Sequence, residues 1–318
     1  MPSVLRRRRV PFAAVLAIVL LIAEVIVQPS FASPGNWAAE LGVLAPFAIV
    51  AMASTPAIIS GGGGIDLSIG PLSTVVNCIF VSWLLPHGLG GAVSVPILLA
   101  VGIAVGAING LLVGALRYQP VVATLCVFFI LSGLAAKISP NPGTLPANWT
   151  IHLAQGIGFF PGALLTIGFP LVVWAALSRT SFHRTLFAVG GDDGSAYSAG
   201  IDVVRVRILA YTLGGLFAAV GGIALTALIQ TSAPSLSTQY ALIALAGVAL
   251  GGTPIGGGRG GLVGSLLGAF CIYMIQQLLS SAGVSADYQQ LAYGALLIAG
   301  VMLSMRYPRG LRLGSSAA

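Results

Sequence analysis

The stretch that decides the fold is residues 41–72, LGVLAPFAIVAMASTPAIISGGGGIDLSIGPL. Residues 41–60 contain no charged side chain, and an apolar run of this length crosses the ~30 Å hydrocarbon core of a bilayer as a helix. Four glycines then interrupt the run, and Asp66 and Ser68 follow directly. Irregular backbone at membrane depth needs protein or a watery cavity to satisfy its polar groups. The stretch therefore predicts a broken helix beside a cavity, with Asp66 capping the span that follows.

The composition extends this interpretation to the whole chain of 318 residues. It is 57% hydrophobic and 7% charged, whereas soluble domains carry about a quarter charged residues. These values exclude a soluble enzyme, a secreted disulfide scaffold and a disordered chain. The sequence predicts an all-α polytopic membrane protein, with residues 1–318 forming a single transmembrane domain.

We expect about ten transmembrane helices, and the distribution of basic residues sets their orientation. If the N-terminus is cytoplasmic, the inner segments contain every arginine, and only Lys137 lies on the outer side, as the positive-inside bias requires. Both termini are then cytoplasmic, and five spans per half allow an inverted repeat, although no residue-level repeat is evident. The expected spans are 10–28, 41–60, 70–86, 91–115, 119–137, 161–178, 207–230, 238–252, 261–281 and 287–305.

The first 35 residues have a second interpretation as a secretory signal peptide. Four arginines, an apolar run and Ser30-Phe31-Ala32 fit that pattern. The length of the run, together with Glu24 and Pro29 near its end, favours a retained first span. Cleavage would leave the other nine spans oriented as described.

The loops and one glycine pattern give further local expectations. The inner segment 179–206 carries charges of both signs. Gly190-Gly191 is expected to break the chain, Asp192 or Asp193 to cap a short helix over residues 195–199, and Gly200 to end that helix. The outer loop 138–160 is expected to hold a short surface helix. Glycines spaced by four on one span predict close helix packing, at Gly102, Gly106, Gly110 and Gly114.

No arrangement of side chains points to catalysis. The three histidines lie in expected loops, and Cys78, Cys126 and Cys271 lack metal or redox spacing. The second glycine-rich stretch, residues 251–261, cannot be a phosphate-binding P-loop, because that motif needs a lysine and the chain has only Lys137. We therefore expect no enzymatic activity, no metal and no cofactor. The net charge of +7 reports membrane topology, so we expect membrane lipid and no nucleic acid as a partner.

Uncharged polar side chains within the spans suit an uncharged solute rich in hydroxyl groups. Taken singly, each is better explained by hydrogen bonding between helices than by contact with a solute. For Asp66, a role as a cap and a role in the solute path both stay open. Asn109, Tyr211 and Gln230 also lie in spans. The candidate substrate-path residues are Asp66, Ser68, Asn77, Thr124, Gln276 and Gln277.

Four segments, in this order, resemble the hallmark motifs of one membrane-protein family. They are GGIDLSIG (63–70), QPVVATL (119–125), AVGGDDGSAYSAGIDV (188–203) and ALGGTPIGGGRG (249–260). The family is that of the permease subunits of bacterial ATP-binding-cassette importers of the ribose type. Val121, Asp192, Tyr197 and Gln276-Gln277 depart from the usual motif residues, which leaves the particular sugar open.

The resemblance implies a set of partners and a division of labour. Two permease subunits, identical or paralogous, form the pathway in the cytoplasmic membrane, and two cytoplasmic ATPase subunits drive it. A periplasmic binding protein delivers a monosaccharide or related polyol. The inner segment 179–206 becomes the ATPase-coupling loop, with coupling residues Gly191, Asp192, Asp193, Gly194, Ala196, Gly200 and Ile201.

Two alternatives stay open at this point. The solute of such an importer could instead be an amino acid, a nucleoside or a signalling furanose. The chain could also be a stand-alone facilitator or channel that works without an ATPase. An ATPase retained through purification separates the importer from the facilitator.

Overall fold

The structure is a computed structural model, which describes residues 9–285 apart from residues 144, 146, 147, 157 and 159, and a few single positions between 288 and 302. Throughout this part the regular elements are helices. The longer helices are α1 (Arg9–Val27), α2 (Trp37–Ile59), α4 (Ser94–Gly110), α5 (Pro120–Ile138), α7 (Ala163–Leu177), α10 (Val203–Ile229), α11 (Ser237–Leu250) and α12 (Leu262–Ser281). The shorter elements are η2 (Pro29–Ala32), α3 (Ile69–Ile79) with its π-helical extension η3 (Phe80–Leu84), η4 (Leu111–Ala115) continuing α4, α6 (Ile151–Gln155), α8 (Ser181–Gly191), α9 (Asp193–Ser198) and η5 (Pro234–Leu236).

Five of these helices are long and apolar enough to cross a membrane: α2, α4 with η4, α5, α10 and α12. Helices α7 and α8 are long and apolar enough to cross a membrane only when they are taken together, and the chain bends by 89° between them. Three shorter apolar helices lie in α1, in α3 with η3, and in η5 with α11. The prediction of a helical membrane protein is confirmed, and helices occupy each expected range up to residue 281. The last expected span, 287–305, lies outside the described residues except at single positions.

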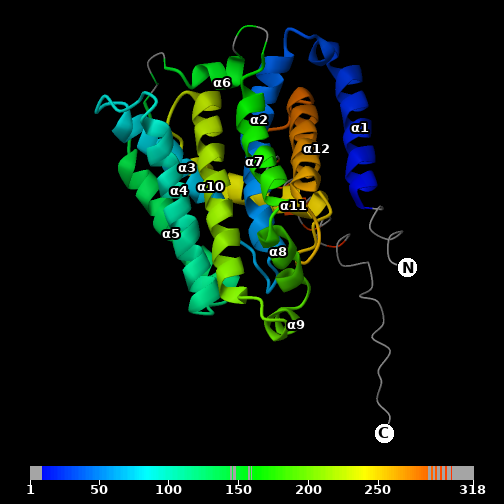
Figure 1. Cartoon of the computed structure of the whole chain (residues 1–318). Helices are drawn as coiled ribbons and strands as arrows, with labels where there is room; N and C mark the ends of the chain where they lie inside the picture. The colour runs from blue at the N-terminus through cyan, green and yellow to red at the C-terminus, as the bar shows by residue number, and fades with distance from the viewer. Residues whose placement is uncertain are drawn as a thin grey trace.

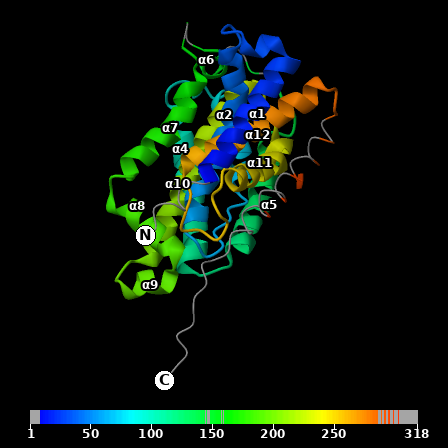
Figure 2. The same ribbon diagram turned by 90° about the vertical axis from the view of Figure 1, so that its right-hand side faces the viewer.

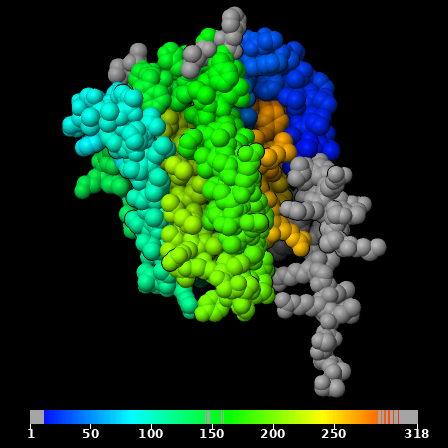
Figure 3. All heavy atoms as spheres, viewed as in Figure 1, coloured from blue at the N-terminus to red at the C-terminus, as the bar shows by residue number. Residues whose placement is uncertain are grey.

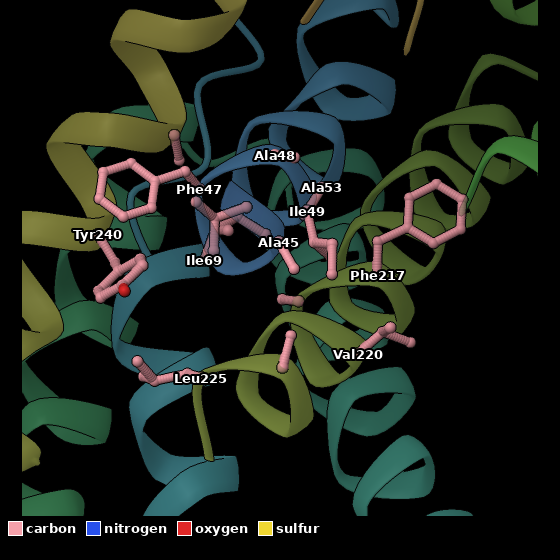
Figure 4. Close-up of a cluster of buried hydrophobic side chains, with 14 of the residues drawn as sticks. Ala45, Phe47, Ala48, Ile49, Ala53, Ile69, Phe217, Val220, Leu225 and Tyr240 are labelled. Carbon is pink, nitrogen blue, oxygen red and sulfur yellow. The ribbon is translucent and has the colours of Figure 1, made fainter. Parts of the chain in front are cut away.

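The bundle is built around α2 and α10. In the 18-residue apolar segment of α2, 94% of the residues are buried, whereas in the corresponding segment of α5 only 28% are buried. A helix that is apolar on all sides belongs in the interior of a bundle, so α2 is central and α5 peripheral. Figure 4 shows side chains of α2, α3, α10 and α11 meeting in this core. There Phe47 packs edge-on against Tyr240 with ring centroids 5.8 Å apart.

Helices α4 and α10 approach each other backbone to backbone along the predicted glycine face. A Cβ placed on Gly102 or Gly106 would overlap backbone atoms of α10, and one on Gly110 would stand 2.7 Å from the Cα of Ile208. Gly114 continues the same line in η4. The prediction of close helix packing by these four glycines is therefore confirmed.

Two short segments mark opposite ends of the bundle. Figures 1 and 2 place α6 at one end and α8 with α9 at the other, and in Figure 3 the green and yellow-green residues of α8 to α10 form the lower surface. The short helix expected in loop 138–160 is α6. The side of the membrane on which each end lies is part of the proposal below.

Segment 179–206 differs from its prediction in one respect. It contains two helices, and α8 continues through Gly190 and Gly191, so the expected break at these glycines is wrong. Gly190 serves packing, because a Cβ at this position would overlap the Ile59 carbonyl oxygen. The turn comes one residue later, at Asp192, and α9 then spans Asp193–Ser198. Gly200 follows with a φ of +80°, which favours glycine.

Candidate functional site

The break between α2 and α3 is the first component of the candidate site. Gly61, Gly62 and Gly63 have φ angles of +76°, +63° and +72°. Three successive residues in the left-handed region are accessible to glycine and strained for other residues. The four-glycine run therefore ends α2 and turns the chain toward α3, as its sequence predicts.

Asp66 is held inside this break by hydrogen bonds. The residue is 6% exposed, and Oδ1 accepts the backbone N–H of Ser68 at 2.9 Å and the Ser68 hydroxyl at 2.7 Å. Asn109 of α4 donates to the Ser68 hydroxyl oxygen at 2.7 Å and lies 3.4 and 3.5 Å from the two carboxylate oxygens. Asp66 thus orders the residues immediately before α3 and connects them to α4. The N-cap of α3 itself is Ser68, and no side chain caps the helix, so the expectation that Asp66 caps this span is wrong.

Thr124 ties the same break to α5. Its hydroxyl oxygen accepts the N–H of Leu67 at 3.2 Å. As a donor, the hydroxyl lies within reach of the carbonyls of Ile65 at 3.2 Å and Pro120 at 2.9 Å. Three of the six predicted path residues, Asp66, Ser68 and Thr124, are therefore within one network.

Three glycine-rich segments meet beside the break, in what we call the glycine junction (Gly61, Gly190, Gly257 and Gly258). The N–H of Gly258 donates to the Ile59 carbonyl at 3.0 Å. A Cβ on Gly258 would stand 2.8 Å from the Gly190 carbonyl oxygen, and one on Gly257 would stand 2.5 Å from the Gly61 Cα. The junction joins the end of α2, the end of α8 and the turn after α11 at backbone contact.

Helix α9 projects from this end of the bundle. Its N-cap is Asp192, whose Oδ1 accepts the N–H of Ser195 at 2.8 Å. Ala196 is buried in a small apolar cluster with Ile59, Leu186, Val189, Val206 and Ala210. Of the other predicted coupling residues, Gly191, Asp192, Gly194 and Gly200 are exposed, and Asp193 and Ile201 are half-buried. One face of α9 is thus fixed to the bundle while the opposite face is open.

A cavity of about 1170 Å³ lies between α9, the start of α10 and the connection from η4 to α5. This volume accommodates a small solute. Its lining combines backbone, aromatic and charged groups, among them Gly62, Arg117, Tyr118, Asp193, Tyr197 and Arg207.

Asn77 lies at the other end of α3 and has a complete set of protein partners. Its amide nitrogen donates to the Thr226 hydroxyl oxygen and to the Thr231 carbonyl, both at 2.9 Å. Its Oδ1 accepts the N–H of Ala233 at 3.0 Å. The side chain therefore holds the connection between α10 and α11, and its place in the solute path stays a prediction.

Replacing Asn77 with alanine is expected to lower the Tm of the purified protein by about 5–10 °C. The change leaves the Thr231 carbonyl and the Ala233 N–H without this partner, and a buried polar group that loses its partner costs about 1–3 kcal/mol. Thermal melting in detergent measures the shift. Asn36→Ala is the control, since Asn36 is exposed and makes one hydrogen bond to the Ser30 carbonyl. Reduced uptake at an unchanged Tm would instead put Asn77 in contact with the solute.

Gln276 and Gln277 lie far from Asp66. Gln277 of α12 donates to the Glu40 carboxylate at 3.3 Å, and the Tyr273 hydroxyl is hydrogen-bonded to the same carboxylate. Glu40 is near the first residue of α2, and Asp66 follows its last residue, so a helix length of about 30 Å separates them. The structure does not bring the two glutamines together with Asp66, and their role in the path stays a prediction.

Two residues of this region are not among the predicted site residues. Asn109 contacts Asp66. The sequence feature that could have indicated it is a single amide side chain in α4, next to the face on which glycines are spaced by four. Arg207 was expected only as an inner-side charge. Its side chain is 16% exposed and forms an ion pair with Asp193, which no local pattern indicates.

Comparisons with known proteins agree with this architecture. A family model described as "Branched-chain amino acid transport system / permease component" matches residues 37–301. The ribose import permease protein RbsC of Bacillus subtilis is 32% identical over 93% of this chain and 92% of its own length. The fructose import permease protein FrcC of Rhizobium meliloti is 31% identical over 91% and 83%, and the autoinducer 2 import system permease protein LsrD of Photorhabdus luminescens is 33% identical over 80% and 78%.

No solved structure matches the chain. The family model nevertheless covers α2 to α12 and beyond. The ribose and fructose permeases align over most of their own lengths. The chain therefore belongs to the family of branched-chain amino acid transport system permease components.

Proposed function

We propose that this chain is the membrane-spanning permease subunit of an ATP-binding-cassette importer for a monosaccharide or a related polyol. The observation that carries the proposal is the similarity, over more than nine tenths of this chain, to permeases named for ribose and fructose import. ATP hydrolysis then belongs to separate subunits, in agreement with the missing P-loop lysine. The protein is a multi-pass component of the bacterial cytoplasmic membrane.

The proposed topology has ten spans, with both termini in the cytoplasm and the second five spans inverted relative to the first. The helices at the expected ranges up to residue 281 support it, as does the one-sided distribution of arginines. The end of the bundle that carries α8 and α9 is then the cytoplasmic end. The proposed partners are two ATPase subunits, a second permease chain, identical or paralogous, and a periplasmic binding protein.

The break between α2 and α3 is our proposed centre of the solute path. Broken helices inside a bundle supply both free backbone groups and a cavity. Asp66, Ser68 and Thr124 border this break, and the cavity opens beside Gly62. Asn77, Gln276 and Gln277 stay candidates for more distant parts of the path.

Helix α9, with the flanking coupling residues, is our proposed docking element for the ATPase. Its open face offers Gly194 and Tyr197, while Ala196 fixes the other face to the bundle. Closure of an ATPase pair favours whichever transporter conformation contacts it better. A displacement of α9 would therefore shift the equilibrium of the spans that pack on it.

Purification of the tagged chain from its native membrane, followed by reconstitution, tests the proposal. A retained ATPase whose hydrolysis rises with a ribose-loaded binding protein supports the sugar importer. Stimulation by leucine instead would favour the amino-acid alternative, which the description of the family model raises. Solute flux through vesicles that hold only the purified chain would support a stand-alone facilitator.

Substitution of Gly194 by tryptophan is expected to reduce ATPase copurification by about tenfold or more. Gly194 lies on the open face of α9, and its Cβ position has only Asp192 Oδ1 within 4 Å. The new side chain would therefore obstruct docking and leave the bundle intact. Gly91→Trp is the matched control, since Gly91 also has free space and lies at the opposite end of the bundle. Full copurification with Gly194→Trp would move the docking surface away from α9.

A further inference from the structure

Two arginines on the first turns of α10 differ sharply in environment. The side chain of Arg205 is 83% exposed and pairs with Asp202 three residues earlier on the chain. That of Arg207 is 16% exposed and pairs with Asp193 of α9. Charged side chains at helix ends normally reach toward water, so the inward position of Arg207 requires a reason.

The buried face of the Arg207 guanidinium rests on the glycine break. A Cβ on Gly62 would overlap its Nη2 atom, and Cζ and Nε are the next nearest atoms. The stem of the side chain passes η4, where a Cβ on Gly114 would stand 3.3 Å from the Cβ of Arg207. One side chain therefore contacts α9, the break before α3 and the end of α4.

Polar atoms without partners continue from Arg207 into the bundle. Among the described residues, Arg207 Nε, the Tyr211 hydroxyl and Asn109 Oδ1 are buried and have no hydrogen bond. Tyr211 lies one turn beyond Arg207 on α10, within electrostatic range of both Arg207 and Asp66. Asn109 contacts Asp66 directly. Leaving buried polar atoms unpaired is costly, and a second arrangement in which they find partners would relieve that cost.

We infer that Arg207 is a positioning residue of the transport cycle: its guanidinium links α9 to the break at Gly62, so that a shift of α9 reorients the Asp66 network. The inference rests on the proposed function, because α9 must be moved by a partner. When α9 shifts, the pair with Asp193 either carries the guanidinium along or releases it from Gly62. In both cases the backbone that leads to Asp66 loses its support, and the unpartnered atoms beside it become free to pair.

A residue that only stabilises the fold, which we call a staple, and a positioning residue differ in what their removal changes. A staple contributes stability, and its loss lowers the amount of folded complex without altering the work of each complex. A positioning residue changes the amount of solute moved per ATP hydrolysed in complexes that remain assembled. The ratio of uptake to hydrolysis is therefore the measurement that separates them.

The experiment uses the full transporter, with its ATPase and binding protein, in proteoliposomes. Arg207→Met keeps the approximate length of the side chain and removes its positive charge, and Asp193→Asn removes the negative charge that pairs with it. In complexes that retain their ATPase, we expect about a tenfold or greater fall in solute moved per ATP hydrolysed for both variants. The double variant should fall no further than either single one, because the two residues act as a unit.

Arg205→Met is the matched control, with the same change two residues away at an exposed pair, and its uptake per ATP should equal that of wild type. A wild-type ratio of uptake to hydrolysis in Asp193→Asn would overturn the inference. Because the Asp193 side chain is half-exposed, we expect this variant to fold and assemble, so it tests the inference even if Arg207→Met does not assemble. A wild-type chain that retains no ATPase would count against the proposed function instead. The two failures are thereby distinguishable.

Discussion

Gly190→Ala is expected to lower the Tm by about 5–10 °C and to abolish uptake. The new methyl group would overlap the Ile59 carbonyl oxygen and stand 2.6 Å from the Gly258 nitrogen. The three atoms nearest to the new methyl group all belong to the backbone, so a change of side-chain rotamer does not relieve the overlap. Relief requires separating α8 from α2 and breaking the hydrogen bond from Gly258 to Ile59. Overpacking of this kind costs about 1–3 kcal/mol, and the lost hydrogen bond adds about 1 kcal/mol.

Melting temperature and uptake of the purified variant measure this effect. Gly256→Ala is the control in the same glycine-rich turn, because no atom lies within 4 Å of its Cβ position and its φ is not in the left-handed region. We expect that variant to melt and transport like wild type. Wild-type melting of Gly190→Ala would contradict the backbone contact between the three glycine segments.

Asp66→Ala is expected to reduce uptake by about 100-fold or more. The change removes the acceptor of the Ser68 N–H and hydroxyl and leaves Asn109 with the Ser68 oxygen alone. Hydrogen bonds to a charged group contribute about 1.5–3 kcal/mol each, and about 1.4 kcal/mol corresponds to a factor of ten. Binding of the ATPase should persist, because Asp66 is not among the residues of α9.

Asp66→Asn separates the two roles that the sequence leaves open for this residue. The Asn carbonyl oxygen can still accept from Ser68, so a residue that only orders the chain before α3 would keep both Tm and uptake. We expect the Tm to be kept and uptake to fall by about tenfold, because the amide offers one acceptor oxygen where the carboxyl group faces Asn109 with two. Uptake assays at matched protein levels decide the matter, with Asp202→Asn as the control at the exposed N-cap of α10. Full uptake with Asp66→Asn would limit Asp66 to ordering the chain before α3.

Much of the fold could be predicted from local patterns. Apolar runs located the helices up to residue 281, and glycines spaced by four located the contact of α4 with α10. The cap at Asp192 was also predictable, because a short acidic side chain before a helix accepts its free N–H groups. Each of these features depends on residues within a few turns of one another.

The candidate site was predictable only in part. Asp66, Ser68 and Thr124 do lie together, whereas Gln277 pairs with Glu40 at the far end of α2. The sequence predicts that Gly190 ends a helix, because glycine ends helices more often than it continues them. In the structure Gly190 lies within α8, where the missing side chain lets the backbone of α8 contact Ile59 and Gly258. Glycine has both uses, and the choice between them depends on what lies opposite.

The amino-acid sequence on its own determined that this is a helical membrane protein and where its helices run, because hydropathy and charge act along a continuous stretch of chain. Only the tertiary structure decided that Gly61, Gly190 and Gly258 meet and that Arg207 turns inward to Asp193 and Gly62. Such contacts depend on how whole helices pack against one another. No short-range pattern specifies which distant residue will occupy the facing surface.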